Sequence, residues 1–279
     1  MKAWLNGELV DDAAALVPIT DKGFLVGDGV FETLRAYEGA AFALREHVER
    51  LAHSAGVMGI ELPALAELEA AVEATVAANE LSEARVRVTV TSGDGPAGLG
   101  RGEGRPTALV TATPLPDWPA TARAVISPWP RNERSVLAGV KTTSNAENIV
   151  KLAHARREGA DEAISVNLAG NLCEGTSSNV FIVRGTHVST PSLDAGCLAG
   201  ITRDHVLALD AVAPLEIAEE NVSASELRDA DELFLTSSTR ELQPLVKLDG
   251  HAIGDGEPGP ITRRLAAAFS EMVREKLRG

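Results

Sequence analysis

Hydrophobic and polar positions alternate along much of the chain, and two stretches of helical spacing interrupt the first half. Asn6-Gly7 favours the positive φ angles of a tight turn, so the opening residues are predicted to form a hairpin. The period-two pattern predicts strands within 3–10 and at 30–37, 41–44, 85–91 and 107–113. Helical spacing predicts helices at 46–58 and 65–79. The glycine-rich segment 93–105 is far too long for a hairpin turn, which indicates a functional loop.

Three prolines within residues 114–119 make a stiff connector, and we place the domain boundary there. Beyond it, strands are predicted at 124–127, 162–167, 172–174, 179–183, 187–190 and 233–236. Ser144 with Glu147 and Ser223 with Glu226 have the spacing of capping boxes, so helices are predicted to begin there. A helix is also predicted after Gly200, and the last one runs from about 260 to 277. The prediction is an α+β protein with a small domain at 1–113, a linker at 114–122 and a large mixed-sheet domain at 123–279.

The charge of the chain limits its partners. A net charge of −14 argues against nucleic acid and against an anionic membrane surface, because phosphate groups are bound by basic surfaces. The N-terminus has no apolar signal region, and two cysteines without a CxxC spacing predict buried thiols. We therefore expect a cytoplasmic protein that binds a small molecule.

Two ionisable residues stand in unusual surroundings. Lys141 lies between a predicted strand and a predicted helix, where partial desolvation would make its amine a usable nucleophile or base. Glu174 lies between apolar strand residues, and a carboxylate facing inward there needs a positive or protonated partner. The ordinary alternatives are a solvated surface lysine and a turn acid on the solvent side.

Hydroxyl groups gather at two further places. Gly200-Ile201-Thr202 opens a helix with unpaired backbone N–H groups, and Thr236–Thr239 ends a strand with four hydroxyls in a row. Either segment suits an anion, although both patterns also fit ordinary caps. No motif for metal-dependent hydrolysis, nucleotide phosphate binding or an α/β-hydrolase nucleophile is present, and no metal site is predicted.

Taken in order, these segments resemble the class IV aminotransferases, the fold type IV pyridoxal-phosphate enzymes. The resemblance extends over essentially the whole chain. It is carried by GDGVFETLR (27–35), HVERL (47–51), KTTSNAEN (141–148), the block 159–181, CLAGITR (197–203) and FLTSSTRELQP (234–244).

The resemblance implies a role for each segment. Lys141 matches the lysine that holds pyridoxal 5'-phosphate as a Schiff base and moves the Cα proton, and Glu174 matches the acid paired with the pyridine nitrogen. Leu198 matches the residue packed against the ring. The positions that match phosphate-binding residues are Arg50, Ile201, Thr202, Ser237 and Ser238. Family members also place the active site between the two domains and at a dimer interface, so a homodimer is expected.

The substrates implied are an amino acid and a 2-keto acid. A substrate carboxylate is best held by arginine, and the candidates are Arg35, Arg101 and Arg240. Phe31 stands where D-amino acid transaminases of the family carry a tyrosine that helps to bind this carboxylate. Val26 and Thr33 replace a tyrosine and a glycine that are expected of branched-chain transaminases.

We therefore favour a transaminase for D-amino acids with a different arginine clamp. Three alternatives stay open: an aminodeoxychorismate lyase that gives 4-aminobenzoate and pyruvate, a branched-chain L-amino acid transaminase, and a cofactor-binding protein without turnover. The intact Lys141 and Glu174 argue against the last.

Overall fold

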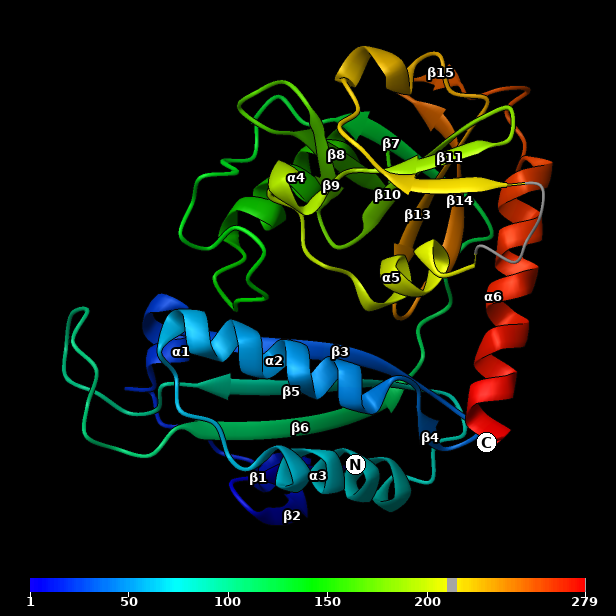
Figure 1. Ribbon diagram of the computed structural model, residues 1–279. Helices are drawn as coiled ribbons and strands as arrows, with labels where there is room; N and C mark the ends of the chain where they lie inside the picture. The colour runs from blue at the N-terminus through cyan, green and yellow to red at the C-terminus, as the bar shows by residue number, and fades with distance from the viewer. Residues whose placement is uncertain (210–214, 279) are drawn as a thin grey trace. The chain divides into compact units, whose positions relative to one another are not determined.

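The computed structural model describes residues 1–209 and 215–278. The chain divides into two compact units, each with its own sheet (Figure 1). Unit 1 comprises Met1–Pro116 and Val140–Asn145, and unit 2 comprises Asp117–Gly139 and Ala146–Gly279. The α+β class with an N-terminal and a C-terminal sheet agrees with the prediction. The predicted domain boundaries stay a prediction.

Unit 1 is built on a six-stranded antiparallel sheet with the order β2-β1-β6-β5-β3-β4. The predicted hairpin is present, with φ angles of 49° at Asn6 and 104° at Gly7. Its elements are β1 (Lys2–Leu5), β2 (Glu8–Asp11), α1 (Lys22–Val26), β3 (Gly29–Tyr37), β4 (Ala40–Ala41), α2 (Leu44–Met58), α3 (Leu65–Ala78), β5 (Ala84–Thr91) and β6 (Thr107–Pro114).

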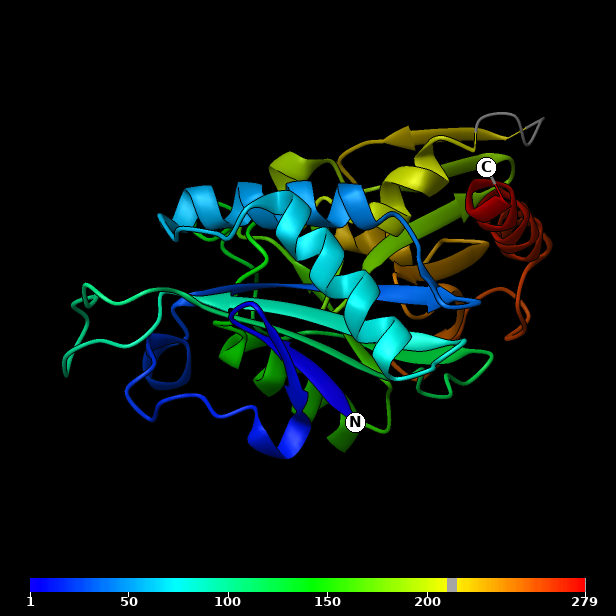
Figure 2. The same cartoon turned by 90° about the horizontal axis from the view of Figure 1, so that it is seen from below.

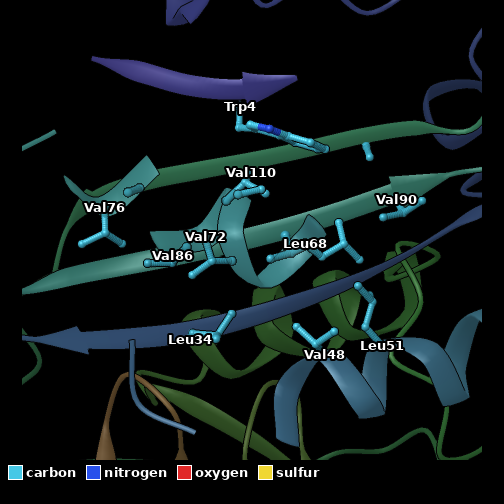
Figure 3. Close-up of a cluster of buried hydrophobic side chains, with 14 of the residues drawn as sticks. Trp4, Leu34, Val48, Leu51, Leu68, Val72, Val76, Val86, Val90 and Val110 are labelled. Carbon is cyan, nitrogen blue, oxygen red and sulfur yellow. The ribbon is translucent and has the colours of Figure 1, made fainter. Parts of the chain in front are cut away.

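Both long helices of unit 1 pack against one face of this sheet (Figure 2). Figure 3 shows the cluster, in which Leu34 of β3 and Val110 of β6 meet Leu51 of α2 and Val72 of α3. Each of these side chains is fully buried, and burial of one such side chain stabilises the fold by about 1.5–3 kcal/mol. The strands therefore have a core face and a second face whose side chains are partly exposed.

Unit 2 is built on a nine-stranded mixed sheet with the order β12-β11-β10-β13-β14-β7-β8-β9, and β15 pairs with β14. Three neighbouring pairs in it are parallel: β11 with β12, β14 with β7, and β7 with β8. Its elements are β7 (Ala122–Ile126), α4 (Ala146–Arg157), β8 (Glu162–Val166), β9 (Leu172–Gly175), β10 (Asn179–Arg184), β11 (His187–Thr190), α5 (Ile201–Leu207), β12 (Glu216–Glu219), β13 (Glu232–Ser237), β14 (Glu241–Leu248), β15 (His251–Ala252) and α6 (Pro260–Arg278).

The core of unit 2 is also apolar. Phe181 and Phe234 stack in the middle of the sheet with ring centroids 4.8 Å apart, and α6 buries Leu265 and Phe269. The capping box of Ser223 and Glu226 is formed. At the start of α4, the carboxylate of Glu147 instead accepts a hydrogen bond from the buried amine of Lys151.

Several elements differ from the sequence prediction, among them the short helix α1 and strand β15, which were not predicted. The returning strand is only Ala40–Ala41, because α2 begins at Leu44. Strands β12 and β14 were not predicted. Pro244 interrupts the strand pattern of β14, and a proline cannot donate to a ladder.

Candidate active site

The backbone around Lys141 is attached to unit 1 at the edge of its sheet. Residues 141–143 pair with the start of β3, where the Phe31 N–H donates to the Lys141 carbonyl over 3.0 Å and the Thr143 N–H donates to the Gly29 carbonyl over 2.8 Å. The Lys141 N–H donates to the hydroxyl of Ser54 on α2 at 3.2 Å. Backbone hydrogen bonds on both sides of its Cα therefore fix the lysine on the folded unit.

The side chain of Lys141 lies at the partly exposed face of the sheet. Its Nζ is 4.7 Å from the centre of the Phe31 ring, and the guanidinium carbon of Arg87 is 3.9 Å from the same ring centre. Such cation–π contacts stabilise by about 0.5–1 kcal/mol each. The structure thus brings together Lys141, the predicted substrate residue Phe31, and an arginine that the sequence analysis did not single out.

Arg87 is partly buried on this face of the sheet. Its Nε donates to the Thr89 hydroxyl at 3.1 Å, and no carboxylate forms an ion pair with it among the described residues. Burial, followed by the positive charge of Arg85, lowers the pKa of Arg87 from its ordinary value. The register of β3 and β5 places Arg87 on the same face as Phe31, and only the alternation within 85–91 is visible in the sequence.

Arg50, a predicted phosphate ligand, is held in a buried cluster on the opposite face. Its Nε and Nη2 donate to the two oxygens of Glu32, each over 2.7 Å, and His47 Nδ1 is 2.7 Å from Glu32 Oε2. Burial opposes the ionisation of Glu32. The charges of Arg50 and His47 and their hydrogen bonds outweigh it, and they hold the pKa of Glu32 far below its usual range.

Two predicted carboxylate ligands of unit 1 already have anionic partners. Arg35 pairs with Glu83 at 3.0 Å and stacks on Tyr37. Arg101 donates to both oxygens of Asp28 at 2.7 Å. It also donates to the carbonyls of Met58 and Gly59. Arg101 therefore fastens the glycine-rich segment to the loop before β3 and to the end of α2.

In unit 2, Glu174 lies at the end of β9 and is 8% exposed. Its Oε2 accepts the backbone N–H of Leu198 at 2.9 Å, and its Oε1 is 3.4 Å from Arg131 Nη2. The carbonyl of Leu198 accepts from the Asn179 amide at 2.8 Å. Leu198 is thus held at both its N–H and its carbonyl, beside the acid that the sequence analysis had singled out.

The predicted phosphate hydroxyls lie at the beginning of α5 and at the end of β13. Ile201 and Thr202 form the first turn of α5, where the Thr202 side chain is buried. Ser237 ends β13, and its hydroxyl accepts the Arg240 N–H at 3.3 Å; Ser238 follows in the turn. The neighbouring Thr236 hydroxyl is buried and has no hydrogen-bond partner among the described residues.

Arg240, the third predicted carboxylate ligand, is bound inside unit 2. Its Nη1 donates to the fully buried Glu162 at 3.1 Å and its Nη2 to the Ser177 hydroxyl at 3.1 Å. The guanidinium also lies 4.4 Å from the centre of the Trp118 ring. Glu162 accepts further hydrogen bonds from Thr176 and Ser178, so this ion pair closes the loop between β9 and β10.

Comparison with known proteins identifies the family. The sequence profile of Amino-transferase class IV matches residues 29–248. The chain is 37% identical to a putative branched-chain-amino-acid aminotransferase of Methanocaldococcus jannaschii, over 98% of this chain and 96% of that protein. It is 34% identical to a D-alanine aminotransferase of Bacillus licheniformis, over 98% and 97%.

The fold comparison agrees. A T.th. branched-chain amino acid aminotransferase, solved in complex with N-(5'-phosphopyridoxyl)-L-glutamate, superposes with a TM-score of 0.91 at 29% identity and covers 98% of this chain and 93% of that one. The chain belongs to the class IV aminotransferases, and it is a pyridoxal-phosphate-dependent enzyme of that family. Among residues 1–209 and 215–278, no helix combines the length and apolarity needed to cross a membrane.

Proposed function

We propose that the protein transfers an amino group between a D-amino acid and a 2-keto acid, with Arg87 holding the substrate carboxylate. One observation carries this proposal: the Phe31 ring has both the Lys141 amine and the Arg87 guanidinium against it. An amine that moves a proton at the substrate Cα needs the carboxylate on that same carbon to be held nearby. Lys141 and Arg87 are side chains of the right chemistry for these two tasks.

The donor groups fit pyridoxal phosphate. In unit 1, Lys141 supplies an amine and Arg50 a guanidinium for the phosphate. In unit 2, Glu174 supplies a buried carboxylate for the pyridine nitrogen, and Arg131 offsets its charge. The hydroxyls of Thr202, Ser237 and Ser238, with the N–H of Ile201, are phosphate donors. The Thr236 hydroxyl next to them is buried and has no hydrogen-bond partner within residues 1–209 and 215–278. A polar ligand bound at this place would supply one.

The residues of the chain then divide the work. When bound, the cofactor withdraws electrons from the substrate Cα and makes its proton removable. Lys141 takes that proton on Nζ and returns it, which is a general-base role. Glu174 keeps a proton on the pyridine nitrogen. Leu198, whose backbone N–H and carbonyl are both hydrogen-bonded, packs beside the ring.

Arg87 replaces the three arginines of the sequence analysis as the proposed carboxylate ligand. Arg35, Arg101 and Arg240 each have a carboxylate partner within 3.1 Å. To recruit one of them, the substrate would have to break an existing ion pair, whereas Arg87 has its charge available on the Lys141 side of the sheet. Arg87 supplies hydrogen-bond donors for the carboxylate, which Phe31, without a hydroxyl, cannot supply.

The preference for D-amino acids is supported by the D-alanine aminotransferases among the relatives and by Val26 and Thr33, which depart from the branched-chain pattern. A branched-chain L-amino acid transaminase is the second candidate, since the Methanocaldococcus relative carries that description. A homodimer is also proposed. Its support on the chain is a set of exposed apolar side chains in unit 1, namely Leu16, Ile19, Phe24 and Leu99.

The test is a half-reaction followed in the absorbance band of the bound cofactor. D-alanine, D-glutamate, L-leucine and L-glutamate are added separately to the purified holoenzyme. We expect the D-amino acids to convert the band. Conversion by the L-amino acids alone would establish the branched-chain candidate, and no conversion by any of them would favour the lyase.

The carboxylate assignment has its own matched pair of variants. Arg87→Ala is expected to raise the half-saturating D-alanine concentration about 10- to 100-fold, because a charge-assisted contact of about 1.5–3 kcal/mol is lost. Arg85→Ala, two positions along the same strand and exposed, is expected to leave it within about twofold. Equal effects of the two substitutions would refute the role of Arg87.

A further inference from the structure

Glu32 is out of place in the pattern of its strand. The core-facing positions of β3 are otherwise apolar, with Val30, Leu34 and Ala36 fully buried against the helices. Glu32 occupies the same face and is 1% exposed. A buried carboxylate costs several kcal/mol unless it is paired and hydrogen-bonded, so this position is maintained against a large desolvation cost.

The partners of Glu32 come from one side of α2. His47 and Arg50, three residues apart on this helix, both reach its carboxylate. The two hydrogen bonds from Arg50 use Nε and Nη2, which form one edge of the guanidinium. A two-pronged contact of this kind fixes the plane of the group as well as its position.

His47 holds the carboxylate in turn. Glu32 is ionised and accepts only, so the proton between them belongs to His47 Nδ1, an assignment made from the network. Burial, together with the charges of Arg50 and Lys141, lowers the pKa of His47 from its ordinary value, although Glu32 acts in the opposite direction. His47 is fully buried and cannot swing away. The carboxylate is therefore fixed before it fixes Arg50.

We propose that Glu32 is a positioning residue, which orients the Arg50 guanidinium for the cofactor phosphate. This inference rests on the phosphate role proposed above for Arg50. A mobile arginine side chain loses rotamer entropy when it binds an anion, and a guanidinium already fixed in the folded protein loses less. The buried carboxylate of Glu32 on β3 thus orients the guanidinium of Arg50 on α2.

Replacement of Glu32 by glutamine separates the orienting role of Glu32 from the effect of its negative charge. Glutamine keeps one acceptor oxygen but presents an amide N–H₂ in place of the other, so it cannot accept from both Nε and Nη2. If the main effect of Glu32 is to orient the Arg50 guanidinium, Glu32→Gln weakens phosphate binding, even though a negative charge has been removed. If the main effect is the repulsion between the Glu32 carboxylate and the phosphate, the same substitution strengthens phosphate binding. The two cases therefore change the affinity for the phosphate in opposite directions.

The experiment compares two ligands of the full-length apoprotein, pyridoxal 5'-phosphate and unphosphorylated pyridoxal, by fluorescence titration. The measured quantity is the dissociation constant for pyridoxal divided by that for pyridoxal 5'-phosphate, a ratio that isolates the phosphate. We expect Glu32→Gln to reduce this ratio about tenfold, Arg50→Gln to reduce it at least as much, and the double variant to be no worse than Arg50→Gln. Glu32→Asp, which restores the charge on a shorter arm, is expected to recover part of the ratio.

The control is Glu49→Gln, which removes an exposed carboxylate paired with Arg45 on the same helix, and it should leave the ratio unchanged. An unchanged or increased ratio in Glu32→Gln overturns the inference, as do independent, multiplying effects of Glu32→Gln and Arg50→Gln. An unchanged ratio in Arg50→Gln removes the premise instead, because Arg50 would not hold the phosphate. If Glu32→Gln does not fold, Glu32→Asp is decisive, and a ratio equal to that of the unsubstituted protein overturns the inference.

Discussion

Both units bury a glutamate against an arginine, and the pair of Glu32 in unit 1 is built differently from the pair of Glu162 in unit 2. In unit 1, Glu32 is bound by the side chains of Arg50 and His47, both from α2. In unit 2, Glu162 accepts from Arg240, from the backbone N–H of Thr176 and from two hydroxyls of the same loop. Both carboxylates are nearly inaccessible to solvent.

The difference lies in what each carboxylate holds in place. Glu32 joins a strand to a helix that is already packed, so its effect is on the orientation of one guanidinium. Glu162 organises the backbone of residues 176–178, which lie between two strands and belong to neither. The same chemical pair therefore orients a side chain in one unit and shapes a loop in the other. Residue type and burial alone do not separate these two uses.

The largest effect is expected when the second pair is broken. Glu162→Gln should destabilise the protein by about 3–5 kcal/mol, because it leaves Arg240 uncompensated in a buried place. Chemical denaturation gives the free energy, and hydrogen exchange should show faster exchange of the Thr176 N–H. Replacing both partners, as in E162Q/R240M, should recover much of the loss. Glu83→Gln, at the half-exposed pair with Arg35, should cost under about 1 kcal/mol. If Glu162→Gln and Glu83→Gln lower the unfolding free energy equally, burial does not explain the difference between the two ion pairs.

An intermediate effect is expected at Arg101, which combines an ion pair with two backbone carbonyls. Arg101→Ala should cost about 1–2 kcal/mol of unfolding free energy, since several charge-assisted hydrogen bonds are lost at a partly exposed place. It should also expose residues 93–105 to proteolysis. Arg105→Ala, in the same loop and exposed, is the control and should change neither quantity. If Arg101→Ala lowers the unfolding free energy as much as Glu162→Gln, burial does not determine how much each ion pair contributes to stability.

The smallest effect is expected at the surface of unit 2, where His187 lies between Glu220 and Glu216. The hydrogen bond to Glu220 raises the pKa of His187 above its ordinary 6.5, and the charges of both glutamates add to the rise. Because the pKa of His187 is higher in the folded protein than in the unfolded chain, its protonation stabilises the fold. This contribution is complete at pH values below the pKa of the unfolded chain, and it is lost as the pH rises through the pKa of the folded protein. The Tm difference between the unsubstituted protein and His187→Gln should therefore be largest near about pH 5.5 and absent above about pH 8, with under about 1 kcal/mol at stake. A constant difference over that range would exclude the ionic contribution.

Much of the fold could be predicted because the strands of unit 1 alternate cleanly and its helices have apolar stripes. Strand β14 could not be predicted, because Pro244 interrupts its sequence pattern and Glu241 at its start has a positive φ. Its partners β13 and β7 stabilise it, but no local sequence signal marks this pairing. Strand β12 pairs in parallel at the edge of the sheet, where its partly exposed residues give little hydrophobic signal.

The candidate site shows the same limit. Lys141 and Glu174 were singled out from their neighbours along the chain, since one precedes a helix and the other interrupts an apolar strand. Their site roles stay a prediction. Arg87 was not singled out, because its significance depends on Phe31 in the adjacent strand of the sheet, and register is not visible in a single strand. The ion partners of Arg101 and Arg240 lie 73 and 78 residues away along the chain, which no local pattern reveals.

The order of the chain has a consequence for biosynthesis. Val140–Asn145 belongs to unit 1, although residues 117–139 of unit 2 precede it. The six strands and two long helices of unit 1 therefore leave the ribosome before Lys141 does, and the start of β3 is one partner short until that segment arrives. A nascent chain halted at Pro116 would contain the whole first sheet but not Lys141. The segment that carries Lys141 is thus added late, at the edge of a sheet that has already been synthesised.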